Sequence, residues 1–514
     1  MKEVLVNPAL VKSLSVRLFF ATFVAALLLV PVASLAQIGN TVTGAGALNN
    51  ITTGNFNTAT GYQALDYDTT GSSNTATGYQ ALAQNSTGIN NTANGFGALV
   101  SNTTGYDNTA NGYDALFSNL IGIYNSANGY EALYSNTTGG YNTANGGLAL
   151  YSNSTGGYNS VNGFYALYSN TTGDSNTANG YSALFSNTTG STNTANGVNA
   201  LYFNTTGGGN TADGVNALYH NTTGSGNMAN SSYALYANTT GSYNMASGYA
   251  SLYKNTTGIS NTAYGYETLY ANVTGNWNTA YGLNALKALN GDGGSSAATA
   301  GNFNIGLGYG AGQNITTGSN NIAIGNYGVA ADNGVIRIGT VGTQGATFIA
   351  GINGVTASQG VAVYINANGQ LGTLTSSARF KHDIHDMGTT SDRLMDLRPV
   401  SFHYNAAAED GSHPVQYGLI AEEVAQVYPE MVQYDREGKP FTVYYQQLTP
   451  MMLNELQKAH HRSETQETEI GVLKSEVASL RQVQQQQLMV FAAFVLAIVL
   501  GAAFVLAARI RPSR

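Results

Sequence analysis

The sequence contains no cysteine and few charged residues. The absence of cysteine excludes disulfide bonds and thiolate metal sites. Charged residues make up only 9 % of the chain, too few for the solvated surfaces of ordinary helices, and 63 glycines disfavour long helices further. The formal net charge is −8, and no basic cluster occurs in the repeats described below, so the electrostatic footprint of a nucleic-acid-binding protein is missing.

In place of these residue types, the chain has a repeat of 17 residues. Its consensus is N-T-A-x-G-Y-x-A-L-x-x-N-T-T-G-x-x, and 15 copies run in register from Asn40 to Asn278. An insertion rich in Gly, Ser and Ala within Asn290–Gly301 shifts the register, which resumes at Asn304 and Asn321. Because so short a period cannot hold two helices, it predicts a β-solenoid.

Each copy predicts a short strand and a corner. The N-T-A-x-G segment has a small third residue, such as Ala59 or Val161, as expected for a tightly wound interior. The N-T-T-G segment predicts a corner at which Gly supplies positive φ. The ninth residue is Leu in all 15 in-register copies, from Leu48 to Leu286. Burial of this row, by neighbouring coils or by three chains packed together, should contribute roughly 1.5–3 kcal/mol per coil.

The repeated Asn, Thr and Tyr residues are open to other interpretations. The N-x-T triplets match glycosylation acceptors, but they occur where a turn would place Asn and Thr anyway. Rows of Thr are compatible with ice or glycan binding. Tyr at the sixth position, as in Tyr62 and Tyr79, is compatible with sugar stacking, although such rows are more often cross-strand packing. Asp does not recur at a fixed position, which argues against a calcium-binding roll.

The N-terminus has the pattern of a secretion signal. Lys12 and Arg17 precede an apolar run from Leu18 to Val30, and small residues stand before Gln37. The pattern predicts a signal peptide over residues 1–36, with an uncleaved anchor as the alternative.

The C-terminus has the pattern of a membrane span. Leu488 to Ala508 is an uninterrupted apolar segment of 21 residues, and arginines follow it in the tail 509–514. By the positive-inside rule the tail is cytoplasmic. The rest of the mature chain is then expected outside the cytoplasm, at the cell surface or in the periplasm, held by this single C-terminal span.

A Ser–Lys pair stands at the start of the segment that follows the repeats and a β connector. Ser376 and Lys381 lie five positions apart in the sequence S-S-A-R-F-K. A serine hydroxyl is a poor nucleophile until a base takes its proton, and lysine can be that base only where burial or a neighbouring cation lowers its pKa. Ser–Lys pairs are a known variant of the catalytic triad. Taken alone, however, a serine near a lysine usually belongs to a surface turn.

The flanking sequence resembles the endosialidase-type intramolecular chaperone family. The family's first block, S-D-x-R-x-K, is matched by Ser376, Arg379 and Lys381, with Ser377 in place of the usual Asp. Later blocks follow in the family's order: Leu394–Val400 with Ser401–Tyr404, Tyr417–Val424, Tyr428–Glu430, and Val443–Tyr445 with Leu448. The resemblance implies a small α/β domain over 376–457 that drives assembly of a homotrimer and cuts its own chain.

The same resemblance assigns the roles at the cut. Ser376 is the nucleophile that attacks the carbonyl of Thr375, Lys381 is the general base, and no cofactor or metal takes part. Ser377 lies four residues before Lys381 and is the alternative nucleophile. His382 and Asp383 are expected to be solvated residues at the start of a helix.

Two further segments bear on the oligomeric state. The late copy N-N-I-A-I-G, Asn320–Gly325, resembles the repeat of trimeric autotransporter adhesin heads, in which three β-rolls pack together. From Leu456 a heptad pattern predicts a coiled-coil stalk over 458–487, with Ile470, Leu473, Val477 and Leu480 as its apolar part. β-branched residues at a and Leu at d favour a dimer, whereas the family implies a trimer.

The expected chain is therefore mainly β. It contains a β-roll over 37–338, a β connector over 339–375, the chaperone domain, the coiled coil and one transmembrane helix over 488–508. Within the connector, Val361–Leu374 is expected to form a hairpin, with Asn368–Gly369 as its turn signal. The expected function is that of a trimeric, adhesin-like surface fibre that assembles with its own chaperone and is released by self-cleavage. The alternatives are a fibre of tail-spike type that binds a glycan or protein receptor, and a structural filament with an inactive dyad. No recurring carboxylate pair supports a glycan hydrolase.

Overall fold

The computed structural model describes residues 38–290, 301–350, 352, 357–366, 368–407, 411–435 and 437–509. The chain divides into two compact units, the first ending at Thr347 and the second beginning at Phe348. The predicted signal peptide, most of the insertion after Asn290 and nearly all of the predicted cytoplasmic tail lie outside the described residues.

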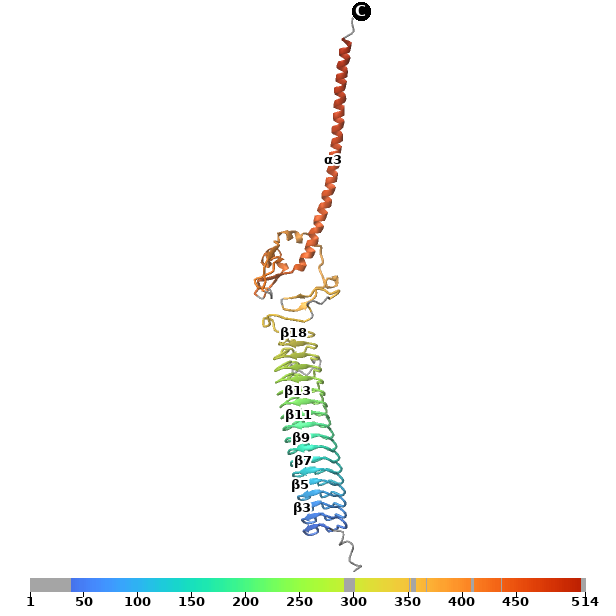
Figure 1. Ribbon diagram of the computed structural model, residues 1–514, viewed down its shortest axis with the longest axis vertical. Coiled ribbons are helices and arrows are strands. Elements are labelled where there is room, and N and C mark those ends of the chain that lie inside the picture. The colour runs from blue at the N-terminus through green and yellow to red at the C-terminus, as the bar shows by residue number, and fades with distance from the viewer. Residues whose placement is uncertain are drawn as a thin grey trace, which may run out of the picture. The chain divides into compact units, whose positions relative to one another are not determined.

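The first unit is a stack of short parallel strands (Figure 1). Each coil contributes one three-residue strand that pairs in register with the strands of the neighbouring coils, as Ala76 does with Ala59 and Ala93. The predicted β-solenoid is confirmed. Its strands are β1 Thr41–Thr43, β2 Thr58–Thr60, β3 Thr75–Thr77, β4 Thr92–Asn94, β5 Thr109–Asn111, β6 Ser126–Asn128, β7 Thr143–Asn145, β8 Ser160–Asn162, β9 Thr177–Asn179, β10 Thr194–Asn196, β11 Thr211–Asp213, β12 Met228–Asn230, β13 Met245–Ser247, β14 Thr262–Tyr264, β15 Thr279–Tyr281, β16 Ile305–Leu307, β17 Ile322–Ile324 and β18 Ile336–Ile338.

The small third residue and the ninth-position Leu fill the interior of the coils. Ala178 and Leu184 belong to one coil, and both side chains are fully buried. The same holds along the stack, where these residues form one continuous core. Neighbouring coils of a single chain therefore cover the Leu row. Of the two alternatives, burial by neighbouring coils is confirmed.

Nearly every coil has glycine at two positions, and the two glycines are required for different reasons. Gly180, at the fifth position, has φ +140°, and a Cβ there would lie 2.5 Å from the carbonyl oxygen of Gly197 in the next coil. Gly190, in the N-T-T-G corner, does not have positive φ, so the conformation predicted there is wrong. A Cβ on Gly190 would lie 2.4 Å from both Asn187 Oδ1 and the oxygen of Gly207. This corner needs glycine because neighbouring atoms leave no space.

Buried Asn side chains form rows along the stack. In the row at the twelfth position, Asn102 Nδ2 donates to Asn85 Oδ1 at 2.8 Å and to the Gly105 carbonyl at 2.9 Å. Both Asn side chains are fully buried. An Asn in this position is not accessible to a glycan-transferring enzyme. The N-x-T triplets of these coils are therefore structural, as the sequence interpretation favoured.

Aromatic side chains at the sixth position stack on one another. The rings of Tyr62, Tyr79, Phe96, Tyr113 and Tyr130 follow each other at centroid distances of 4.8 to 5.4 Å, with interplanar angles of at most 13°. The face of each inner ring is covered by its neighbours. Cross-strand packing is thus confirmed for this row, and the ring faces that a sugar would need are already occupied.

The outward side chains of the sheet change character along the stack. In β2 to β11 they are Thr, Ser, Asn and Asp, whereas each strand from β12 to β18 carries at least one large apolar or aromatic residue. Most of these side chains are exposed, up to 69 % for Ile338. The C-terminal part of the sheet therefore presents an apolar face, formed by Met228, Met245, Tyr264, Tyr281, Ile305, Leu307, Ile336 and Ile338.

The second unit begins with a hairpin and continues into a small mixed domain. Strands β19 Tyr364–Ile365 and β20 Leu371–Gly372 pair antiparallel around Gly369, which has φ +79°, so the predicted hairpin is confirmed. Two further antiparallel pairs follow, β21 Val400–Phe402 with β22 Gln416–Gly418 and β23 Val432–Tyr434 with β24 Pro440–Val443. The helical elements are η3 Ala378–Phe380, η4 Gly388–Asp396, α2 Ala421–Val427, η5 Pro429–Met431 and α3 Tyr445–Ala508.

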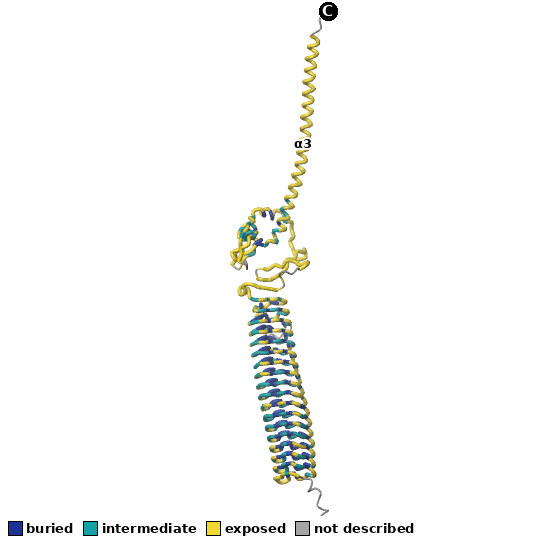
Figure 2. The backbone as a smooth tube through the Cα atoms, viewed as in Figure 1, coloured by how far each residue is buried: buried dark blue, intermediate teal, exposed yellow. Residues whose placement is uncertain are grey.

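Helix α3 contains 64 residues, a length of roughly 96 Å at 1.5 Å per residue. It covers both the predicted stalk and the predicted span without interruption (Figure 1). Apart from its first turns, nearly all of its residues are exposed (Figure 2). By length and composition it is a candidate membrane-spanning helix.

Candidate functional site

The predicted Ser–Lys pair lies at the two ends of the single turn η3. Ser376 precedes the N-cap residue Ser377, which has extended backbone angles of φ −65° and ψ 140°, and Lys381 is the C-cap residue. The turn is closed by the backbone N–H of Phe380, which donates to Ser377 O at 3.0 Å. The N–H of Lys381 donates to Ala378 O at the same distance. The fold thus holds both residues on one short, turn-forming segment.

The whole segment around the pair is exposed. Residues 371–386 are all solvent-accessible, and within the described chain no hydrogen bond or ion pair involves the side chains of Ser376, Ser377 or Lys381. Burial is what a lysine needs in order to act as a general base, and a single chain does not provide it here. His382 and Asp383 are 94 % and 83 % exposed, which confirms that they are solvated, but η4 begins only at Gly388, so they do not start a helix.

The flanking blocks of the sequence motif come together in one core. Leu394, Val424, Tyr428 and Val443 each come from a different block, and they pack together with Met431, Val432 and Met451. Arg398 and Glu423 link two of these blocks through a bidentate ion pair, at 2.5 and 3.1 Å. The hydrogen bond to Arg398 lowers the pKa of Glu423. This arrangement explains why the blocks occur together in the sequence.

A second Ser–Lys pair lies within the same unit, where η4 meets the first turns of α3. The side chain of Ser391 is fully buried, and its hydroxyl donates to Glu455 Oε1 at 2.6 Å. Lys458 Nζ lies 3.3 Å from Ser391 Oγ, 2.7 Å from Glu455 Oε1 and 2.5 Å from Asp392 Oδ1. Asn454 Nδ2 donates to Ser391 Oγ at 2.6 Å.

The electrostatics of this second pair do not suit catalysis. The hydrogen bonds to Asp392 and Glu455 raise the pKa of Lys458, and the bond from Lys458 lowers the pKa of Glu455. A lysine held between two carboxylates keeps its proton and cannot deprotonate a serine. The cluster formed by Ser391, Asp392, Asn454, Glu455 and Lys458 instead fastens η4 to α3.

Sequence reasoning missed this cluster. The i, i+3 spacing of Glu455 and Lys458 indicates a local ion pair, but no signal links either residue to Ser391, more than 60 positions earlier. The described residues also contain no group of His, Asp and Glu side chains that could hold a metal ion.

Comparison with known proteins finds a family match within the second unit. No curated protein and no solved structure matches the chain. One family model matches, over residues 376–433, which include η3, η4, α2, η5, the strand pair β21–β22 and the first two residues of β23. Residues 376–433, which come after the solenoid and the hairpin β19–β20 in the sequence, carry the signature of the family described as the chaperone of endosialidase.

Proposed function

We propose that the chain is a trimeric fibre that assembles with its own chaperone domain and then cuts itself between Thr375 and Ser376. The observation that carries this proposal is the boundary of the family match, which begins at Ser376 itself. A cut immediately before Ser376 would leave a C-terminal fragment whose first residue is the nucleophile.

The proposed chemistry uses two side chains of η3. Lys381, as the neutral amine, takes the hydroxyl proton of Ser376 while Oγ attacks the carbonyl carbon of Thr375. The bond between the Thr375 carbon and the Ser376 nitrogen breaks, the nitrogen takes up a proton, and an ester remains. Water then hydrolyses the ester, which gives a carboxylate on Thr375 and a free amino group and hydroxyl on Ser376.

Assembly explains why the cut would wait for the folded fibre. In a single chain Lys381 is exposed, so it lacks the burial that a lysine needs in order to act as a general base. Packing of three chains around η3 would remove water from Lys381 and so activate the Ser376–Lys381 pair. The apolar outward face of β12 to β18 supports self-assembly, because exposed apolar patches on soluble proteins usually mark interaction sites.

The order of the segments gives the cut a consequence. The solenoid lies on the N-terminal side of Thr375, and the candidate membrane-spanning part of α3 lies on the C-terminal side. With the solenoid outside the cytoplasm, cleavage would release the repeats from the anchor. An adhesin-like role of the released or displayed fibre follows from its architecture and has no identified receptor.

Gel migration of the full-length chain tests the cleavage. The wild-type chain should give two fragments, and Ser376→Ala and Lys381→Ala should each give one. Ser377→Ala is the matched control, since it changes the neighbouring hydroxyl on the same turn and should still give two fragments. Loss of cleavage in Ser377→Ala with retention in Ser376→Ala would transfer the nucleophile to Ser377. A single band for the wild type would leave a structural filament with an inert dyad.

A further inference from the structure

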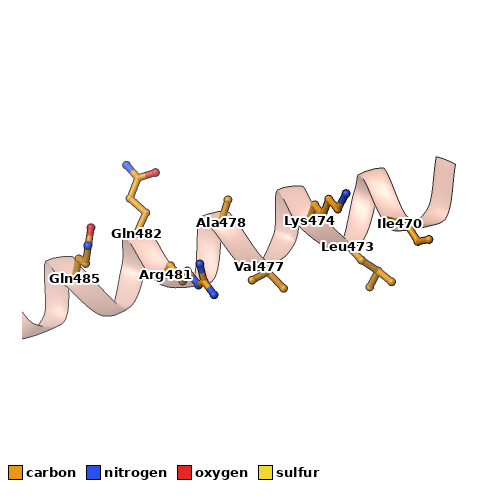
Figure 3. A pocket seen from close by; sticks show the side chains of 8 residues that line it. All are labelled: Ile470, Leu473, Lys474, Val477, Ala478, Arg481, Gln482 and Gln485. Carbon is orange, nitrogen blue, oxygen red and sulfur yellow. The ribbon is translucent and has the colours of Figure 1, made fainter. Parts of the chain in front are cut away.

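Helix α3 carries an apolar row that nothing in the described chain covers. Ile470, Leu473, Val477 and Leu480 are between 48 % and 67 % exposed. Figure 3 shows Ile470, Leu473 and Val477 on the same side of the helix, at the a and d positions of the heptad. A shallow groove along this part of the helix is lined by Ile470, Leu473 and Val477 of the row, together with Lys474 and Arg481.

The charges beside this row form no ion pair within their own helix. Residues of opposite charge support a helix when they lie three or four positions apart. None of Arg462, Glu467, Glu469, Lys474, Glu476 and Arg481 has an oppositely charged residue at such a spacing, and none forms an ion pair in the described chain. Residues of opposite charge instead lie five positions apart, in the pairs Arg462 and Glu467, Glu469 and Lys474, and Glu476 and Arg481.

A spacing of five is the spacing of interhelical pairs in a parallel coiled coil. There, a residue at position g faces the residue five places later, at position e, of the neighbouring helix. With Ile470 and Val477 at a, the residues Arg462, Glu469 and Glu476 occupy g, and Glu467, Lys474 and Arg481 occupy e. All three g-to-e contacts between two identical helices in register therefore join opposite charges.

We propose that this face of α3 binds the same face of other copies of the chain, parallel and in exact sequence alignment. The charge pattern favours the parallel arrangement over the antiparallel one. In an antiparallel pair overlapped on the same apolar segment, g faces g and e faces e. That arrangement places Glu469 against Glu476 and Lys474 against Arg481, so like charges meet on both flanks of the row.

The inference deepens the assembly part of the proposed function and does not depend on the cleavage. Parallel alignment of α3 brings the C-terminal ends of all copies to the same side, as a shared membrane anchor requires. It also holds the η4 segments at equal heights, because Ser391 is fastened to Glu455 near the start of the same helix.

Disulfide trapping in the full-length chain tests the arrangement, because the native sequence has no cysteine. Ser463→Cys places a thiol at position a, where parallel, aligned copies bring identical residues together. Ser475→Cys, the matched control, makes the same isosteric change at position f on the outer face. Mild oxidation in detergent should give on the order of tenfold more covalent dimer for Ser463→Cys than for Ser475→Cys.

Charge changes in the Ser463→Cys chain test the pairing itself. Glu469→Lys with Glu476→Lys makes both flanks positive and should lower the yield of covalent dimer on the order of tenfold. Addition of Lys474→Glu and Arg481→Glu restores opposite signs and should restore the yield. Equal trapping at 463 and 475, or a yield that charge reversal does not change, would overturn the proposal.

The same experiment separates this inference from self-cleavage. Residues 463 and 475 lie on the C-terminal side of the proposed cut, so the disulfide forms on the same fragment whether or not the backbone is cut. Trapping is therefore performed in the wild-type background and in Ser376→Ala. Failure of cleavage changes the size of the bands, whereas failure of the pairing removes the covalent dimer in both backgrounds.

Discussion

The substitution Gly180→Ala examines how closely the coils of the solenoid are packed. The backbone of Gly180 has φ +140°, a conformation that residues other than glycine rarely adopt. Among the described coils only Ser231 stands at the same repeat position without being glycine, with φ +151°. An added Cβ would lie 2.5 Å from the carbonyl oxygen and 2.7 Å from the carbonyl carbon of Gly197. Neither atom can move without separating the two coils, because both belong to the backbone of the next coil.

The loss of stability expected for Gly180→Ala has two parts. A non-glycine residue held in this conformation costs about 1–3 kcal/mol. Relief of the overlap would also lengthen the hydrogen bonds between adjacent coils, such as the 2.8 Å bonds from Gly180 N–H to Asn162 O and from Gly197 N–H to Asn179 O. We expect the free energy of local opening to fall by at least about 3 kcal/mol.

Hydrogen exchange of the backbone amides measures this local opening. A loss of about 3 kcal/mol corresponds to exchange roughly a hundredfold faster. Because each coil of a solenoid contacts only its neighbours, the faster exchange should be confined to the coils around residue 180.

Gly209→Ala provides the matched control. Gly209 also has positive φ, at +68°, but a Cβ there would meet nothing closer than 3.9 Å. Other copies carry Phe, Ser or Asn at this position of the repeat. The substitution should cost about 1 kcal/mol, roughly fivefold in exchange rate. Equal effects of the two substitutions would refute the packing argument.

Three further perturbations follow from the structure. Leu184→Ala should lower the free energy of unfolding, measured by chemical denaturation, by about 2–5 kcal/mol, because neighbouring coils bury the Leu184 side chain fully. A loss below about 1 kcal/mol would contradict that burial. Burial raises the pKa of Asp68 from 3.8 to about 6. The stability that the neutral acid gives to the first coils is therefore complete below pH 4 and is lost as the pH rises through 6. Asp68→Asn should abolish this pH dependence, as measured by hydrogen exchange. Ion pairing with Lys458 lowers the pKa of Glu455. The contact between η4 and α3 should therefore persist at neutral pH and weaken as the pH falls below about 4.5. Lys458→Met should remove this pH dependence, as measured by protease sensitivity near residue 391.

The period of the sequence was sufficient to predict the solenoid. One strand per 17 residues follows from the alternation in N-T-A-x-G, and the small residue in its centre, such as Ala178, is buried as predicted. The apolar helix at the C-terminus and the hairpin around Gly369 were also predictable, because length and turn residues are local signals. Local sequence was therefore a reliable guide wherever the structure depends on neighbouring residues.

The packing between coils was harder to predict. The sequence does not distinguish a glycine that needs positive φ, such as Gly180, from one that needs space, such as Gly190. It also does not show that coils of one chain suffice to bury Leu184, because the distance between coils depends on those same glycines.

In the candidate site, too, local features could be predicted from the sequence and contacts between distant segments could not. The turn η3 is local, and its position between Ser376 and Lys381 agrees with the spacing of the motif. The cluster of Ser391 with Lys458 depends on a contact between distant segments, and sequence spacing carries no information about it. Lys381 is exposed in the described chain, and its burial by other copies is part of the proposed function.

The measurement that tests the central claim most directly is the intact mass of the purified, assembled protein, with native mass spectrometry for the number of copies. The account predicts three copies and two polypeptides per copy, one ending at Thr375 and the other beginning at Ser376. An assembled trimer whose chains are all unbroken between these two residues would contradict it.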